Sequence, residues 1–229
     1  MKLLLTSGGV TNASIRAELD RQLGKPVSAC HALAIPTAQW GHPLCGPDSA
    51  RRFVAAGSDR DLTGLGWASV GLLELTALPS IPAERWTSWI RDADALLVDG
   101  GDATYLAHWM RESGLADLLP TLDDTVWVGI SAGSMAMTPR IGHDFVEWAG
   151  AADDSTLGIV DFAIYPHLDV FPSNTVAHAE RWVEDVGLPA YVIDDETAIA
   201  IGDDGIPHVI SEGRWIELRP GQHRTASHR

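Results

Sequence analysis

Over the first part of the chain, short runs of apolar residues alternate with longer stretches in which apolar residues recur every three or four positions. The runs predict buried strands, and the periodic stretches predict amphipathic helices. Strands are expected at residues 3–5, 32–35, 69–75, 95–98 and 126–130, and helices at 12–23, 50–57, 83–93 and 103–119. Because these strands are apolar throughout, both faces of their sheet should be covered, which is typical of a mostly parallel α/β sheet.

After Gly142 the pattern changes. Residues 158–167 predict a strand that runs into a loop, and residues 174–186 predict a helix with an apolar stripe. Short strands follow at 191–193, 198–201, 208–210 and 215–218, with turns at 203–205 and 212–213. They predict an antiparallel meander at one edge of the sheet. No linker or repeat divides the sequence, so we expect a single domain over 1–229 with a flexible tail after about residue 220.

The chain of 229 residues carries a formal net charge of −15 at pH 7. Such an acidic protein is poorly suited to nucleic acid or anionic membranes and better suited to neutral or cationic small substrates, including peptides. The only cysteines, Cys30 and Cys45, are too few for a disulfide framework and lack a zinc-site spacing. No apolar run approaches the roughly 18 residues of a membrane helix, and no signal peptide is evident. We therefore expect a cytoplasmic protein without metal or organic cofactor. Whether the protein forms a homo-oligomer is left open by the sequence.

The segment Gly129-Ile130-Ser131-Ala132-Gly133 matches the pattern G-x-S-x-G directly after a predicted strand. In that context the pattern is typical of a nucleophile elbow, where a serine occupies a strained turn between a strand and a helix. The helix that follows would point its N-terminal amides at the reacting centre. The pattern also fits an ordinary turn of small residues. Ser131 is therefore the candidate nucleophile.

A second glycine-rich loop, Asp99-Gly100-Gly101-Asp102, follows the preceding strand. In a parallel sheet the two loops lie at the same carboxyl edge, where such folds bind ligands. The backbone amides of Gly101 and Ala132 would then form an oxyanion hole. Alternatively, the glycines only turn the chain and Asp102 caps the next helix.

A reactive serine needs a base, which near neutral pH is usually histidine. His167 has the best position, because it directly follows a predicted strand and so faces the same sheet edge. The acid that orients the imidazole is expected in the cluster 194–196 or in the rival pair Asp144 and Glu147. The other histidines that follow the elbow and precede the predicted tail are His143, His178 and His208.

Five segments, in this order, resemble the aspartyl dipeptidase (peptidase E)/cyanophycinase family of serine peptidases. They are 4–9 (LLTSGG), 100–104 (GGDAT), 129–134 (GISAGS), 165–167 (YPH) and 193–198 (IDDETA). The resemblance implies a flavodoxin-like sheet related to class I glutamine amidotransferases, with serine in place of the cysteine nucleophile.

The resemblance also implies roles for individual residues. It makes Ser131 the nucleophile and His167 the base, with the amides of Gly101 and Ala132 as the oxyanion hole. The third member of the triad, generally Glu in the family, falls on Asp195. Glu196 is an alternative acid, and so is Asp144. In aspartyl dipeptidases an aspartate in the loop after the elbow is important, and Asp144 lies near the corresponding place in this sequence.

Two departures from the family pattern concern the substrate. The Gly-Gly-Asn type of motif reads Gly-Gly-Asp here, so Asp102 adds a negative charge beside the oxyanion loop. The arginine cluster that follows the histidine in aspartyl dipeptidases, suited to a substrate carboxylate, is reduced to Arg181 with His178 nearby. Arg140 is an alternative residue that could bind the substrate carboxylate in place of the cluster. These four residues are candidate substrate-binding residues, and a preference for an aspartyl residue stays open.

The leading hypothesis is a serine exopeptidase or dipeptidase that hydrolyses short peptides, Asp-Xaa among the candidates, through a Ser-His-acid triad and an acyl-enzyme. An α/β-hydrolase-type esterase is the alternative, with the order Ser-acid-His formed by Asp195 and either His208 or His223. A non-catalytic amidotransferase-like binding protein is the third reading. A glutaminase would need a thiolate at the elbow, where this chain has Ser131.

Overall fold

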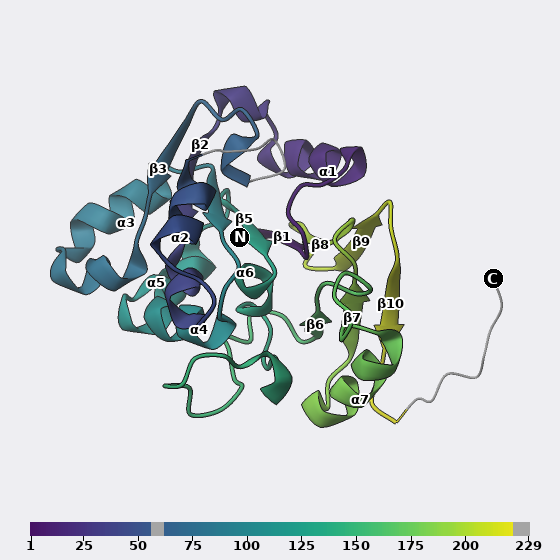
Figure 1. Ribbon diagram of the computed structural model, residues 1–229. Coiled ribbons are helices and arrows are strands. Elements are labelled where there is room, and N and C mark those ends of the chain that lie inside the picture. The colour runs from purple at the N-terminus through teal and green to yellow at the C-terminus, as the bar shows by residue number, and fades with distance from the viewer. Residues whose placement is uncertain (56–61, 222–229) are drawn as a thin grey trace.

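The computed structural model describes residues 1–55 and 62–221. At its centre lies a seven-stranded sheet of order β3-β2-β4-β5-β1-β8-β9 (Figure 1). The first five strands in this order are parallel: β1 (Lys2–Thr6), β2 (His31–Ile35), β3 (Ser69–Leu72), β4 (Ala95–Val98) and β5 (Val126–Ile130). β8 (Thr197–Ile201) and β9 (Pro207–Ser211) complete the sheet as antiparallel neighbours. The predicted mostly parallel sheet is confirmed.

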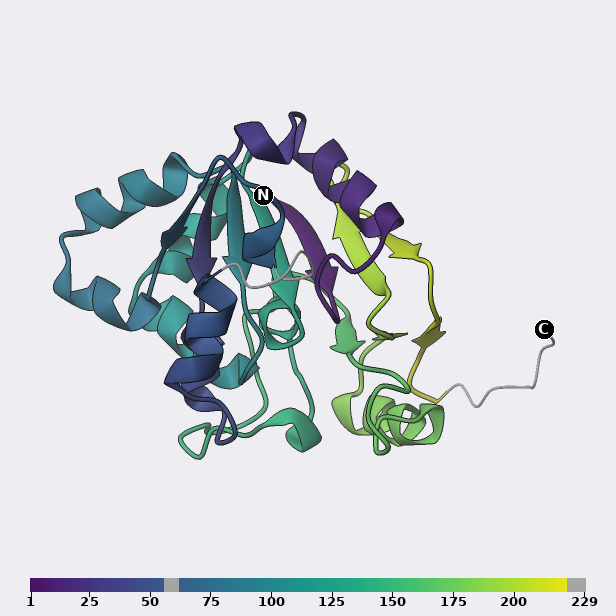
Figure 2. The same cartoon turned by 45° about the horizontal axis from the view of Figure 1, so that its top comes forward.

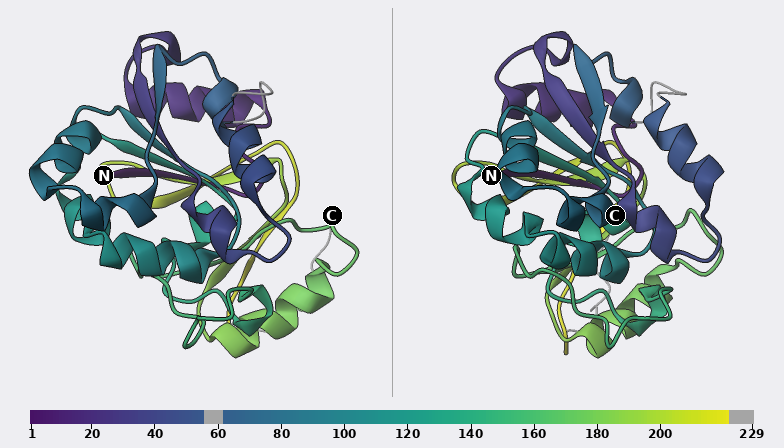
Figure 3. Two further views of the ribbon diagram at one scale, coloured as in Figure 1. Left: turned by 60° about the vertical axis from the view of Figure 1, so that its left-hand side comes forward. Right: turned by 90° about the vertical axis from the view of Figure 1, so that its left-hand side faces the viewer.

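Helices cover both faces of this sheet (Figure 3). On one face Leu4 belongs to the same cluster as Ile15 of α1, and on the other Leu5 belongs to the same cluster as Met110 of α4. Successive strand residues point to opposite faces, so apolar strands need cover on both sides. The first face is covered by α1 (Ala13–Leu23) and α2 (Pro47–Val54), and the second by α3 (Ala83–Arg91), α4 (Ala103–Glu112), α5 (Leu115–Leu118) and α6 (Ala132–Met135).

Most predicted elements are confirmed, and the differences have local causes. The helix predicted over 103–119 is broken because Gly114, at φ 82°, takes a left-handed conformation between α4 and α5. The strand predicted to reach residue 75 ends at Leu72, and Leu75–Ser80 forms a 3₁₀ helix. The helix predicted at 50–57 begins earlier, at Pro47, a residue that suits a first helical turn. Its predicted last two residues lie outside the described residues.

A second sheet of three strands, in the order β10-β7-β6, lies beside the first (Figure 2). It consists of β6 (Ala163–Tyr165), β7 (Ala190–Ile193) and β10 (Trp215–Leu218), and α7 (Val176–Val186) covers it. The strand predicted at 158–167 is shorter than expected and covers only Ala163–Tyr165. The helix predicted from 174 begins two residues later. Trp182 of α7 packs in the core of this smaller sheet.

The predicted meander at a single sheet edge is wrong in its last step. The turn at 203–205 joins β8 to β9 as expected, but β10 pairs with β7 rather than with β9. The register that aligns Thr197 with Ser211 continues without a slip to Ile193 with Trp215. The four strands are therefore one long hairpin that bends at 194–196 and 212–214 as it passes from the large sheet to the small one. Residues 212–213 form part of that bend instead of a hairpin turn.

Within residues 1–55 and 62–221, no helix is long and apolar enough to cross a membrane. The same residues contain no group of three or more His, Cys, Asp or Glu side chains placed to hold a metal ion. The predicted tail lies almost wholly outside the described residues, which end at Gly221.

Candidate active site

The predicted elbow is a sharp turn that depends on two glycines. Ser131 joins β5 to α6 with φ 48° and ψ −109°, a conformation that non-glycine residues rarely adopt. A Cβ atom on Gly129 would lie 2.5 Å from the carbonyl carbon of Gly133. A Cβ atom on Gly133 would lie 2.5 Å from the carbonyl oxygen of Val98 in β4. The glycines of the G-x-S-x-G pattern therefore allow α6 to pack tightly against the two strands while Ser131 turns outward.

The side chains of Ser131, His167 and Asp195 form a hydrogen-bonded chain. His167 Nε2 lies 2.9 Å from Ser131 Oγ, and His167 Nδ1 lies 2.7 Å from Asp195 Oδ1. Ser131 follows β5 of the large sheet, and His167 follows β6 of the small sheet with φ 58°. Asp195 lies at the bend of the long hairpin, between the two sheets. The three residues thus come from three segments that meet where the sheets adjoin.

The three consecutive acids at this bend have three different partners. Asp194 Oδ1 accepts hydrogen bonds from Thr197 Oγ1 at 2.7 Å and from the backbone amide of Glu196 at 3.1 Å, which fixes the bend. Asp195 faces the imidazole. Glu196 Oε2 accepts from Asn12 Nδ2 at 3.1 Å, so the alternative acid points away from the histidine. The segment forms a turn, closed by a hydrogen bond from the Thr197 amide to the Asp194 carbonyl oxygen, and this turn directs only one of the three acids to the ring.

The Asp195 carboxylate is stabilised in its charged form. Burial raises its pKa, but the hydrogen bonds from His167 and Ser7, together with the charge of His167, outweigh burial. The pKa of Asp195 therefore lies below its usual value. At neutral pH this group is an anion beside the imidazole.

Ser7 belongs to this network and was not predicted from the sequence. Its Oγ donates to Asp195 Oδ1 at 2.7 Å and accepts from the backbone N–H of His167 at 2.8 Å. The side chain is fully buried. Ser7 follows β1, which lies next to β5, so its place at the same carboxyl edge was the available signal. The adjoining Gly8 has no room for a Cβ, which would lie 2.7 Å from Asp195 Cβ.

The Gly-Gly loop lies beside the elbow, as expected for neighbouring parallel strands. Gly101 adopts φ 135°, and a Cβ there would lie 2.3 Å from the carbonyl carbon of Ala38. A Cβ on Gly100 would lie 3.6 Å from Cβ of Ser131. Only glycine fits position 101, which brings the loop backbone against the 3₁₀ helix Thr37–Gly41 and next to the serine.

A cavity of about 520 Å³ opens over these groups. Ser131, His167, Gly101 and Ala132 all line it, and its walls come from 39–45, 144–147 and 171–174. Cys45 also lines the cavity, but burial raises the pKa of its thiol, so it is mostly protonated at neutral pH. Of the described residues that line the cavity, Ser131 thus has its hydroxyl within hydrogen-bond distance of an imidazole, whereas the Cys45 thiol is mostly protonated.

Asp102 is a structural residue rather than a substrate-binding one. It is fully buried and caps α4, with Oδ1 accepting from the backbone N–H of Tyr105 at 2.7 Å. Its Oδ2 accepts from the backbone amides of Glu147 and Trp148, at 2.7 and 2.8 Å. With both oxygens engaged, it ties the loop after the elbow to α4. The expectation that it adds charge to the substrate site is corrected.

The two predicted cations also lie outside the cavity. Arg140 Nε donates to Asp154 Oδ1 at 3.0 Å, and its Nη1 reaches the carbonyl oxygen of Val186 at the end of α7. Arg181 Nη1 donates to the carbonyl oxygen of Ala177, on an exposed stretch of the same helix. Neither guanidinium lines the cavity. The prediction for Arg181 rests on the place of the family's arginine cluster, and Arg140 is the alternative to it; neither rests on how α7 packs.

His178 and Asp144 form a pair at the margin of the site. His178 Nε2 lies 3.3 Å from Asp144 Oδ2, and its Nδ1 lies 2.8 Å from the hydroxyl of Tyr165. Burial raises the pKa of Tyr165 to about 12, so that hydroxyl stays protonated. Asp144 lines the cavity and His178 does not. Asp144 therefore lies at the cavity wall, and its described ion-pair partner is His178 rather than His167.

The Ser-acid-His order of an α/β-hydrolase finds no support among the described residues. His208, on β9, is exposed, and its Nε2 lies 3.4 Å from Asp204 at the hairpin turn. That turn is at the far end of the hairpin from Asp195. His223 lies outside the described residues.

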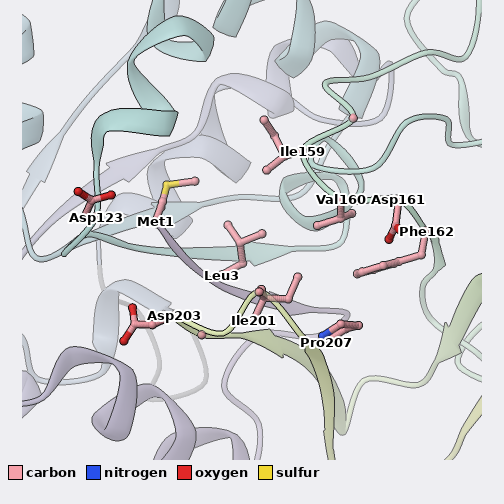
Figure 4. A pocket seen from close by; sticks show the side chains of 13 residues that line it. Met1, Leu3, Asp123, Ile159, Val160, Asp161, Phe162, Ile201, Asp203 and Pro207 are labelled. Atoms are coloured by element: carbon pink, nitrogen blue, oxygen red, sulfur yellow. The ribbon is translucent and has the colours of Figure 1, made fainter.

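A second cavity, of about 690 Å³, lies at the other end of β1 (Figure 4). It is lined by Leu3 from that strand, by Met1, which precedes the strand, and by Asp123, Asp161 and Asp203 from the surrounding loops. None of the predicted site residues lines it.

Two solved structures share this fold at low sequence identity. A candidate peptidase E from Listeria monocytogenes aligns with a TM-score of 0.64 at 19% identity, over 95% of this chain and 98% of that one. A peptidase from an acI-B1 actinobacterium aligns with a TM-score of 0.60 at 17% identity, over 96% and 95% of the two chains. The fold is thus the flavodoxin-like α/β class with a peptidase E-type arrangement.

The sequence comparisons lead to a family. An uncharacterized peptidase of Pasteurella multocida is 27% identical over 120 residues, which are 48% of this chain and 57% of the relative. The match therefore spans little more than half the length of that curated relative. The sequence profile of peptidase family S51 matches residues 3–209, nearly the whole chain. The chain belongs to peptidase family S51.

Proposed function

We propose that the protein is a serine exopeptidase that hydrolyses short peptides, dipeptides included, through an acyl-enzyme. The observation that carries the proposal is the chain of two hydrogen bonds, 2.9 and 2.7 Å long, that joins Ser131 Oγ to His167 and His167 to Asp195. The Ser131 end of this row of hydrogen bonds lies in a cavity at the carboxyl edge of a parallel sheet, where this fold class binds ligands. Membership of peptidase family S51 supports the same reaction class.

In the first half of the reaction, Ser131 Oγ attacks the carbonyl carbon of the scissile peptide bond. Its proton passes to His167 Nε2, and the carbonyl oxygen becomes an oxyanion. The tetrahedral intermediate then collapses, the C–N bond breaks, and the leaving amine takes the proton from His167. The acyl group stays on Ser131 as an ester.

In the second half, His167 removes a proton from water, and the hydroxide attacks the ester carbonyl. A second tetrahedral intermediate breaks its bond to Ser131 Oγ, which recovers its proton from His167. The carboxylic acid product leaves, and the enzyme returns to its starting state.

The oxyanion would be held by the backbone amides of Gly101 and Ala132. Both residues line the cavity beside Ser131, and Ala132 is the first residue of α6. Preorganised amides stabilise the charge only as it develops, and removing one such donor in other enzymes costs about 3 kcal/mol of transition-state stabilisation.

Asp195 would hold the imidazole in the tautomer that carries its proton on Nδ1, which leaves Nε2 free to accept the proton of Ser131. It would also stabilise the imidazolium that forms. Ser7 is proposed as a positioning residue. It acts through Asp195 and through the backbone amide of His167, which it holds at a positive φ.

The test is hydrolysis of a dipeptide panel, combined with labelling by a fluorophosphonate probe. The wild type should hydrolyse at least part of the panel and be labelled once, on Ser131. Ser131→Ala should lose labelling and lower kcat/KM at least about a thousandfold. Ser88→Ala, on the exposed face of α3, is the matched control and should behave as wild type. Equal rates for wild type and Ser131→Ala would overturn the serine mechanism.

A further inference from the structure

We propose that the cavity over Ser131 selects peptides by positive charge on the acyl side of the scissile bond. The charge would come from the free α-amino group and from a Lys or Arg side chain, and an acidic side chain would be rejected. This inference rests on the proposed function and names its substrate class.

The charged side chains that line the cavity favour a cation. Asp144 and Glu147 both line it and are both exposed to solvent. Of the lining residues that the structure describes, none is Lys or Arg. A like charge that enters such a cavity is disfavoured, and an opposite charge is attracted. His178 contacts Asp144 from outside the cavity. Glu147 has no ion-pair partner among the described residues.

Gln39 lines the same wall and adds no positive charge to offset these carboxylates. Its Nε2 donates to Asp99 Oδ2, and a carboxylate oxygen can only accept, so the amide oxygen must point the other way. That Oε1 atom is buried and has no hydrogen-bond donor among the described residues. Gln39 is only 8% exposed and lines the cavity. Because the Oε1 atom is buried, it is not open to direct contact with a bound substrate, and Gln39 contributes a neutral side chain, without a cation, to the wall.

Two aromatic rings complete the fit for a guanidinium or a lysine stem. Phe145 and Phe171 both line the cavity, and the centroid of the Phe171 ring lies 5.4 Å from that of His167. Phe171 is 53% exposed, so its face is open to a ligand. Aromatic faces attract cations, and Arg in particular stacks on them.

An aspartyl side chain would find no Lys or Arg among the described residues that line the cavity. The guanidinium groups of Arg140 and Arg181 are both held by other parts of the protein, outside the cavity. A carboxylate that leaves water for this cavity would therefore meet Asp144 and Glu147 without a compensating cation. The absence of the family's arginine cluster and the presence of these carboxylates point in the same direction.

The experiment compares kcat/KM for peptides that share one leaving residue and differ on the acyl side. The panel is Arg-Xaa, Ala-Xaa and Asp-Xaa with free amino groups, together with N-acetyl-Arg-Xaa, which keeps only the side-chain cation. We expect Arg-Xaa to exceed Asp-Xaa by on the order of ten- to a hundredfold, with Ala-Xaa between them. N-acetylation of Arg-Xaa should lower kcat/KM, because it removes one of the two cations.

Two carboxylate substitutions locate the effect. In the double variant Asp144→Asn/Glu147→Gln, the Arg-Xaa to Asp-Xaa ratio should fall by about tenfold or more. Asp161→Asn/Asp203→Asn removes two carboxylate charges from the other cavity and should leave the ratio unchanged. The ratio, rather than the absolute rate, is the readout, so a variant that is partly misfolded still gives an answer.

The outcomes separate this inference from the function on which it rests. Asp-Xaa hydrolysed as fast as Arg-Xaa by a wild type that the fluorophosphonate labels would overturn the charge selection and leave the serine peptidase standing. An unchanged ratio in the double variant would also overturn it. If no peptide is hydrolysed and Ser131 is not labelled, both proposals fail.

Discussion

The two cavities at opposite ends of β1 have similar sizes and similar charge but very different chemistry. The cavity at the start of the strand, about 690 Å³, is lined by three aspartates, and the one at its end, about 520 Å³, by Asp144 and Glu147. Among the described lining residues, neither cavity has a Lys or Arg. Only the cavity at the carboxyl end holds a serine hydroxyl within hydrogen-bond distance of an imidazole. Size and charge therefore do not identify the reactive site.

Backbone conformation distinguishes the two cavities. The non-glycine residues with positive φ among those described are Ser131, His167 and Asp169, and the first two line the carboxyl-end cavity. At the other cavity, positive φ occurs only at glycines, Gly158 and Gly205. Strained positions persist only where the surrounding structure holds them, and they concentrate at functional sites. The proposed reactive site is thus the cavity at which the fold maintains unfavourable backbone geometry in residues other than glycine.

Removing the imidazole should cause the largest loss of activity and so remove the chemical difference between the two cavities. Among the described residues, His167 is the group within hydrogen-bond distance of Ser131 Oγ that can accept its proton, so His167→Ala should lower kcat/KM at least about a thousandfold. The measurement is peptide hydrolysis under steady-state conditions, with circular dichroism to verify folding.

His208→Ala is the matched control, since His208 is an exposed histidine paired with Asp204 at the far hairpin turn. It should retain the activity of the wild type. A large loss in His208→Ala with little loss in His167→Ala would favour an esterase-type order of residues and contradict the proposed mechanism.

The second effect, in order of size, concerns the acid. Asp195→Asn keeps the shape but offers the wrong partner to His167 Nδ1, so kcat should fall by about a hundred- to a thousandfold. Glu196→Gln, one residue further on, should change kcat little, because Glu196 bonds to Asn12 instead. If Glu196→Gln proved the more damaging substitution, the bend of the hairpin would have been assigned to the wrong acid.

The pair of glycines around Ser131 shows how much a local pattern can predict. The G-x-S-x-G pattern after an apolar strand predicts a turn and a helix, and the structure places β5, Ser131 and α6 in that order. The strands of the large sheet were similarly predictable, because their apolar runs contain enough information about burial. The parts of the site that follow directly from a strand end could thus be predicted from the sequence.

Contacts between distant segments could not be predicted in the same way. Three consecutive acids look alike in the sequence, and the choice among them is made by a bend between two sheets whose strands share one register. The positions of Arg140 and Arg181 depend on how α7 packs, which no local pattern encodes. The role of Ser7 has no local signal, because a serine before two glycines is typical of a turn and its partners lie 160 and 188 positions away in the sequence.

A smaller effect is expected from Ser7. Ser7→Ala removes one hydrogen bond to Asp195 and one acceptor from the backbone amide of His167, so kcat should fall by about tenfold with KM unchanged. This split is expected because Ser7 has no place in the lining of the cavity. Steady-state kinetics at several substrate concentrations measure it.

Ser113→Ala is the matched control for a buried serine hydroxyl, which there donates to the carbonyl oxygen of Met110. It should lower stability by about 1 kcal/mol and leave kcat unchanged. A Ser7→Ala variant that lost stability but kept its kcat would show that Ser7 serves only the fold.

The smallest effect should appear in acid. Because the pKa of Asp195 is lowered in the folded protein, its carboxylate stabilises the fold above the pKa of the unfolded chain, and this contribution is lost as the pH falls through the folded pKa. The side chain is 34% exposed, so screening by solvent should limit the effect to about 1 kcal/mol. Urea unfolding at pH 7 and at pH 3 should show a smaller difference for Asp195→Asn than for wild type. Ser131→Ala keeps the carboxyl and should keep the wild-type difference, whereas an identical difference in all three proteins would mean that the hydrogen bonds to Asp195 orient the imidazole without adding to stability.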